Sequence, residues 1–101
     1  MNISEESLEK GRQVRQVLSN SASPRSASNS AGFDLVPDLE KFALGINFGE
    51  IWSRSQLDIK TRCAITIGAL TALGVEAQIK SYIGYALNAG FEPEEVLEIF
   101  V

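Results

Sequence analysis

The stretch that decides the fold is residues 58–90, DIKTRCAITIGALTALGVEAQIKSYIGYALNAG. Up to Gly74 its apolar side chains lie nearly all round a helix, which is typical of a helix buried in a core or an interface. The second half is amphipathic. Gly74 and Gly90 stand where the two helices are expected to end, because glycine takes the left-handed C-terminal conformation without strain. The stretch therefore predicts an αα-hairpin around which the rest of the chain is arranged.

The apolar spacing also predicts which residues of the hairpin face inward. In the first helix, which Asp58 is placed to cap, the inner stripe is Ile59, Cys63, Ile67 and Leu70. In the second helix it is Val75, Ile79, Tyr82, Ile83 and Ala86. Any chemistry is expected on or against these two helices.

Three further helices are predicted outside the hairpin. One starts after Ser4, a residue that can cap it, and the others start at Pro37 and Pro93, since proline suits the first helical position. The helix from Pro37 has an expected apolar stripe of Leu35, Leu39, Phe42 and Ile46. No stretch alternates as a strand does, so the predicted fold class is all-α, a helical bundle built around the hairpin.

Glycine and serine mark the expected interruptions of this bundle. Gly45 and Gly49 are expected to weaken the helix from Pro37, and residues 49–57 to form an irregular connection into the hairpin. Residues 19–32 are rich in serine and have little to bury, so they are predicted to be a flexible loop. The chain stops at Val101 after an apolar run without a helix stop signal, which indicates either a helix cut short in a fragment or a last apolar turn buried by another subunit.

The composition limits the class of protein. The 101 residues are 45% hydrophobic and 22% charged, as expected for one globular domain over residues 1–101. The net charge of −4 makes nucleic acid an unsuitable partner. There is one cysteine and no histidine, which removes a disulfide framework and the commonest metal ligand. No apolar run approaches the roughly 18 residues that span a bilayer, so we expect a soluble cytoplasmic protein without a membrane partner.

Polar residues around the entry to the hairpin are the first candidates for a site. Arg54 and Arg62 can bind the carboxylates of a small molecule, because the planar guanidinium donates two parallel hydrogen bonds to a carboxylate. The alternative is that they pair with Glu50, Asp58 or a neighbouring subunit. Glu50 is a possible acid or base, and Trp52 lies beside it in the sequence.

Two residues of the hairpin carry groups that could react. The Tyr82 hydroxyl could donate a proton, although an aromatic residue in an apolar helical stripe is more often part of a core. If Tyr82 is catalytic, Arg54 or Arg62 is expected to border it and lower its pKa. Cys63 lies among apolar neighbours, which favours an inert thiol over a reactive thiolate.

Four blocks in this order resemble the γ-carboxymuconolactone decarboxylase family: GRQVRQVL from Gly11, GEIWSR from Gly49, LDIKTR from Leu57 and ALNAGFEPEEV from Ala86. The resemblance implies an all-helical, alkyl hydroperoxidase D-like subunit in a ring-like homo-oligomer, a trimer or hexamer. It also implies removal of CO₂ from a carboxylated muconolactone without a metal or organic cofactor. The hydroperoxidase branch uses Cys-x-x-Cys and a nearby histidine, and this chain has neither.

The chain departs from the family pattern in two ways. The family's decarboxylases carry a histidine ahead of the A-L-N block, at the position that is Tyr82 here. The family also continues beyond Val101 with another helix, so the resemblance implies truncation at that end.

Two functions follow as hypotheses. The first is a cofactor-free lyase in which Arg54 and Arg62 hold carboxylates, Trp52 contributes to substrate binding, and Glu50 or Tyr82 protonates the carbanion that remains when CO₂ leaves. The second is a non-catalytic or repurposed family member that acts through homo-oligomerisation, with Tyr82 filling the former site.

Overall fold

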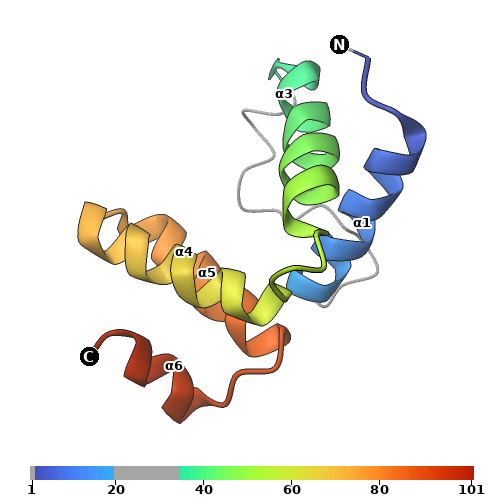
Figure 1. Ribbon diagram of the computed structural model, residues 1–101. Coiled ribbons are helices and arrows are strands. Elements are labelled where there is room, and N and C mark those ends of the chain that lie inside the picture. The colour runs from blue at the N-terminus through green and yellow to red at the C-terminus, as the bar shows by residue number, and fades with distance from the viewer. Residues whose placement is uncertain (1, 20–34) are drawn as a thin grey trace. The chain divides into compact units, whose positions relative to one another are not determined.

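A computed structural model describes residues 2–19 and 35–101, and the regular structure in these residues is helical (Figure 1). The elements are α1 (Glu5–Ser19), α3 (Pro37–Lys41), η2 (Phe42–Trp52), α4 (Ile59–Leu73), α5 (Glu76–Asn88) and α6 (Pro93–Ile99). The predicted all-α class is confirmed. Of the predicted serine-rich loop, 19–32, only Ser19 lies within the described residues, as the last residue of α1.

The chain divides into two compact units, Met1–Ser55 and Gln56–Val101. The first contains α1, α3 and η2, and the second contains α4, α5 and α6. Each unit has buried side chains of its own, such as Leu18 in the first and Ile67 in the second. The single domain expected over residues 1–101 stays a prediction.

The first unit starts with the capped helix that the sequence predicts. The Ser7 backbone N–H donates to Ser4 Oγ at 3.1 Å, which satisfies one of the unpaired donors at the start of α1. The buried residues of α1 recur at intervals of four, three and four, and they are Ser7, Gly11, Val14 and Leu18. This periodicity gives α1 one inner face along its whole length.

The second helix of this unit differs from its prediction. It begins at Pro37 as expected, but it continues as the π-helix η2 through both glycines to Trp52, so the irregular connection is confined to residues 53–58. The expected apolar stripe is also wrong: Leu35 is 84% exposed, Leu39 and Phe42 are exposed, and the buried residues are Gly45, Gly49 and Trp52.

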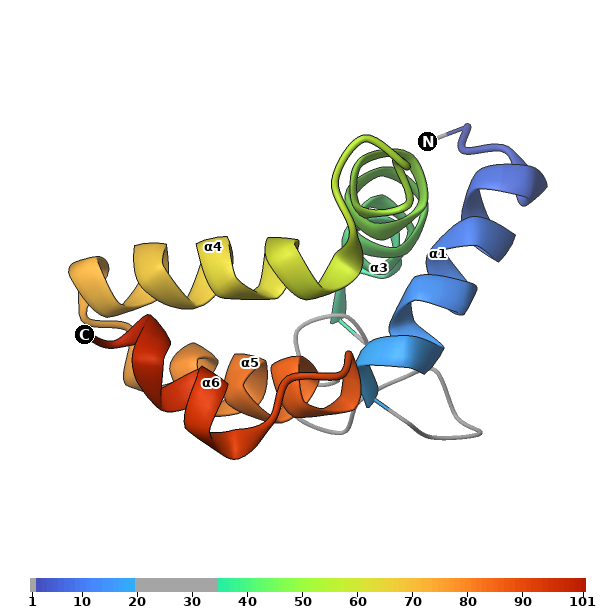
Figure 2. The same ribbon diagram turned by 60° about the horizontal axis from the view of Figure 1, so that its bottom comes forward.

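The reason is a close approach of backbones between α1 and η2, which lie side by side in Figures 1 and 2. A Cβ atom at Gly11 would overlap the carbonyl oxygen of Leu44, and one at Gly49 would overlap the carbonyl oxygen of Ser7. At Gly45 it would overlap the side chain of Ile3. The glycines therefore form the contact between the two helices, because any larger residue would separate them.

The second unit is the predicted αα-hairpin. The Asp58 side chain accepts from the Thr61 backbone N–H at 2.7 Å and caps α4. Gly74 ends α4 with a φ of 74°, and Gly90 follows α5 with a φ of 115°, as the glycine positions predict. The predicted inner face of α4 is confirmed, because Cys63, Ile67 and Leu70 are buried.

The short helix α6 packs against both helices of the hairpin (Figure 2). It starts at Pro93 as predicted, and the Glu95 carboxylate accepts from the Glu92 backbone N–H at 2.9 Å. Lys60 of α4 lies 4.7 Å from the centroid of the Phe91 ring and 3.8 Å from Glu95 Oε1. Within residues 2–19 and 35–101, no helix has the length and apolar character needed to cross a membrane.

Candidate functional site

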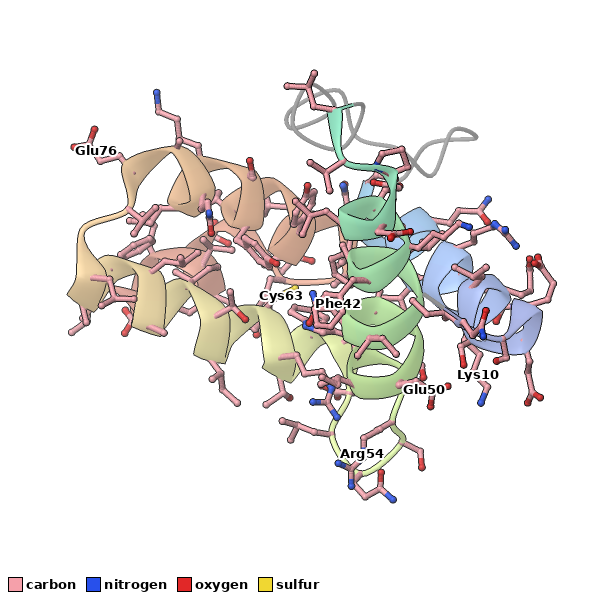
Figure 3. The ribbon with its side chains drawn as sticks, turned by 90° about the horizontal axis from the view of Figure 1, so that it is seen from above. Lys10, Phe42, Glu50, Arg54, Cys63 and Glu76 are labelled. Carbon is pink, nitrogen blue, oxygen red and sulfur yellow. The ribbon has the colours of Figure 1, made fainter. Side chains whose placement is uncertain are left out.

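The five residues predicted for a site fall in both units. Glu50 and Trp52 end η2, and Arg54 lies in the turn that follows (Figure 3). Arg62 lies in the second turn of α4, and Tyr82 lies in the middle of α5. The first three are near neighbours in the chain, and the other two lie on the paired helices of the hairpin.

Glu50 is held by a contact with α1 that the sequence analysis missed. The Ser7 hydroxyl donates to Oε1 of Glu50, and Figure 3 shows Glu50 on the side of η2 next to α1. The Glu50 side chain is exposed to solvent, so it remains open to a proton or a ligand. Ser7 gave no signal in the sequence except its place in the first turn of a predicted helix.

Trp52 is part of the packing of the first unit. It is buried, and its ring lies 5.7 Å from that of Phe48 in an edge-to-face arrangement. The Arg15 guanidinium lies 5.4 Å from the centroid of the same Phe48 ring and pairs with Glu40 at 2.6 Å. A substrate contact for Trp52 stays a prediction, and the structure gives this residue a packing role.

The two candidate arginines have different surroundings. Arg54 is exposed on the turn after η2, where its backbone N–H donates to the Ile51 carbonyl at 3.2 Å. Arg62 is half-buried, and its Nε donates to the Leu57 carbonyl at 3.2 Å. That bond anchors one edge of the Arg62 guanidinium at the start of α4, which fixes where its positive charge lies.

Tyr82 lies on the inner side of α5, as predicted, with its ring 5.0 Å from that of Tyr85. Burial raises the pKa of Tyr82 to about 12, and Tyr85 and then Cys63 add to the shift. The expectation that an arginine lowers the pKa of this residue is therefore wrong in direction. Tyr82 is a neutral phenol at neutral pH, so it can donate a proton but cannot act as a base.

Cys63 is the neighbour of Tyr82 that the sequence analysis did not bring into the site. Its side chain is 0% exposed and lies on the side of α4 that faces α5 (Figure 3). Burial raises the pKa of the Cys63 thiol to about 11, which confirms the predicted inert thiol. The signal in the sequence was that Cys63 and Tyr82 both belong to the apolar stripes predicted to face inward on the two helices.

In the part of the chain that the structure describes, no three His, Cys, Asp or Glu residues lie together in a way that could hold a metal ion. The candidate groups in the second unit are the half-buried Tyr82 phenol and the cation of Arg62. In the first unit they are the Glu50 carboxylate and the cation of Arg54.

Comparisons with known proteins indicate the family. A family model described as the carboxymuconolactone decarboxylase family matches residues 37–101. The chain is 32% identical over 98 residues to a 4-carboxymuconolactone decarboxylase of Acinetobacter baylyi, covering 96% of this chain and 72% of that protein. It is also 39% identical over 66 residues to an uncharacterized 15.0 kDa protein from the nqo9–nqo10 intergenic region of Paracoccus denitrificans. That match covers 63% of this chain and about half of the relative, 49%.

Proposed function

Since this chain belongs to the carboxymuconolactone decarboxylase family, we propose that it is a cofactor-free lyase that removes CO₂ from a small carboxylated lactone or ring compound. The observation that carries the proposal is Tyr82, a neutral phenol on the inner side of the α4–α5 hairpin. It stands where the resemblance places the family's histidine, and it supplies the one group that decarboxylation requires, a proton donor.

The reaction needs one proton for each CO₂ released. When the bond between the carboxylate and the ring carbon breaks, its electron pair remains on the ring as a carbanion or enolate. The Tyr82 hydroxyl transfers its proton to that carbon, and solvent returns a proton to the phenolate. Because burial disfavours the Tyr82 phenolate, the hydroxyl keeps its proton until a strong base forms beside it.

The substrate's carboxylates need cations. Arg62 is the candidate in the second unit, because its anchored guanidinium holds a positive charge in a fixed place. Arg54 is the candidate in the first unit.

Glu50 is the second candidate for proton transfer, since its carboxylate is exposed and held by Ser7. Trp52 would contribute by packing.

Tyr82→Phe tests the proposal. The change removes one oxygen and keeps the ring contact with Tyr85, so the fold should remain while turnover falls by about 100-fold or more. The measurement is CO₂ release, or loss of ring absorbance, from a panel of carboxylated lactones. Tyr85→Phe is the matched control on the same helix and should retain turnover. Undiminished turnover in Tyr82→Phe would exclude Tyr82 as the donor.

A non-catalytic, repurposed family member is the second candidate. It is favoured by the packing of Tyr82 against Tyr85 and by the burial of Cys63, both of which are typical of a core. In that case wild-type protein releases no CO₂ from any lactone of the panel. If Tyr82→His then released CO₂, the presence of tyrosine in place of histidine at this position would explain the inactivity of the wild type.

A further inference from the structure

A directed chain of hydrogen bonds links the first turn of α1 to the candidate acid of η2. The Ser4 hydroxyl donates to Ser7 Oγ at 2.9 Å, and the Ser7 hydroxyl donates to Glu50 Oε1. The Ser7 backbone N–H donates in turn to Ser4 Oγ. Both hydrogen-bonding directions of the Ser7 hydroxyl are therefore used, so its proton is directed at Glu50.

The close packing of the two helices makes this chain possible. Ser7 is only 6% exposed, and its carbonyl oxygen occupies the place where a Cβ of Gly49 would be. The absence of that Cβ brings the α1 backbone near η2 one residue before Glu50. A buried hydroxyl at this place can reach the carboxylate, whereas a surface serine would be hydrated and mobile.

We propose that Ser7 is a positioning residue for Glu50, which holds the carboxylate in one orientation for proton transfer in the reaction. The inference rests on the proposed lyase function and on a role for Glu50 in it. An exposed glutamate has three rotatable bonds, and an unrestrained carboxylate spends little time in any one geometry. A hydrogen bond from a fixed donor restricts the carboxylate before the substrate binds, so less conformational entropy is lost during the reaction.

Ser7 and Glu50 come from different helices, α1 and η2. The family match covers residues 37–101, which contains Glu50 but neither Ser4 nor Ser7. The orienting hydroxyl thus comes from a helix outside the matched region, and the acid comes from inside it.

The test is a double-mutant cycle in the full-length protein: Ser7→Ala, Glu50→Gln and the double variant, assayed for CO₂ release from the lactone that the wild type uses best. Ser7→Ala should lower kcat about tenfold and change KM less than about twofold, because Glu50 is misplaced rather than lost. In the Glu50→Gln background the same change should have no further effect on kcat. Ser19→Ala is the matched control, a serine of the same helix whose hydroxyl bonds to the Arg15 carbonyl.

Urea unfolding verifies that each variant is folded. If Ser7→Ala does not fold, Ser4→Ala removes the donor to Ser7 and should give a smaller loss of kcat that also vanishes in the Glu50→Gln background. Equal losses of kcat in both backgrounds would mean a structural role for Ser7 and would overturn the proposal. Full activity of Glu50→Gln would overturn it while leaving the lyase function standing. A wild type that releases no CO₂ would overturn both.

Discussion

Cys63 and Tyr82 owe their raised pKa values chiefly to burial, to which Tyr85 and Cys63 add at Tyr82. Both groups are neutral when protonated, and removal from water disfavours their charged forms, so the pKa of each rises by about two units. At neutral pH the interior of the hairpin therefore holds a thiol and a phenol that keep their protons. This arrangement suits proton donation and does not suit nucleophilic attack by sulfur.

The raised pKa of Cys63 predicts a loss of stability in alkali. Its thiol has an ordinary pKa of 9.0 in the unfolded chain and about 11 in the folded protein. Between these values the unfolded chain binds fewer protons, so the free energy of unfolding falls as pH rises; the stabilisation is complete below pH 9. We expect Cys63 to account for a loss of about 2–3 kcal/mol by pH 11, measured as the difference between wild type and Cys63→Ala in urea unfolding at a series of pH values.

Cys63→Ala is the control for this loss. Below pH 9 the variant should be less stable than the wild type because it leaves a small cavity, and its stability should change little between pH 8 and 10. Above pH 10 it should still lose stability, because Tyr82 begins to ionise in the unfolded chain there. If the curves of wild type and variant remain parallel from pH 8 to 10, Cys63 does not control the alkaline transition.

Part of the candidate site could be predicted from single residues. The inner position of Tyr82 and the inert Cys63 follow from apolar spacing on each helix. The Ser7–Glu50 bond does not, because 43 residues separate its partners and no property of either residue names the other. The lowered pKa expected for a catalytic Tyr82 is not found; its pKa is raised, because the extent of burial depends on how α4 and α5 pack.

At the scale of helices, the glycines divide into two kinds. Gly11 lies where a Cβ would overlap the Leu44 carbonyl oxygen, whereas a Cβ at Gly68 of α4 would have no atom within 4 Å. Gly11→Ala should therefore destabilise the protein by about 1–3 kcal/mol, because α1 must move away from η2. Gly68→Ala should stabilise it by about 0.5–1 kcal/mol, since alanine lowers the entropy of the unfolded chain and the helix accepts it.

Urea unfolding of both variants against the wild type measures the two effects. The pair is internally controlled, because the chemical change is the same and both positions are within helices. A neutral Gly11→Ala would mean that α1 and η2 are not in backbone contact. Gly68 lies near Ile65 on the exposed side of α4, so the stabilisation is expected at protein concentrations low enough to keep the chain monomeric.

The same glycines explain which helices could be predicted. Asp58, Gly74, Gly90 and the two prolines at helix starts act on their own neighbours, so their effects are visible in sequence. Gly45 and Gly49 were interpreted as local weaknesses in a helix, and locally that is correct. Their actual effect is to let the N-terminal part of the chain approach η2 closely. Local helix propensity carries no information about that contact. For the same reason the buried face of η2 was placed on the wrong residues.

At the scale of the whole molecule, α4 carries apolar side chains that the described residues leave exposed. Ile65 is 60% exposed and Leu73 is 75% exposed, and with Ala69 and Ala72 they lie at helical intervals. We propose that another copy of this chain covers this face, because an exposed apolar face is unfavourable in water. Light scattering at micromolar concentration should show a dimer or larger, and Ile65→Glu should shift it towards the monomer.

Gln78→Glu is the matched control, since it adds the same charge at an exposed polar position of α5. It should leave the molar mass unchanged. A wild type that is monomeric at micromolar concentrations would show that the α4 face is not a contact between copies.

The glycine contact also sets a practical limit on how this protein can be shortened. Trimming the gene to the family-matched residues, 37–101, would remove α1 and leave the bare backbone at Gly45 and Gly49 facing water. Such a product would lose the partner that buries Trp52's helix, and it would be a poor choice for expression or crystallisation. Residues 2–19 belong with any excised version, although the family match begins after them.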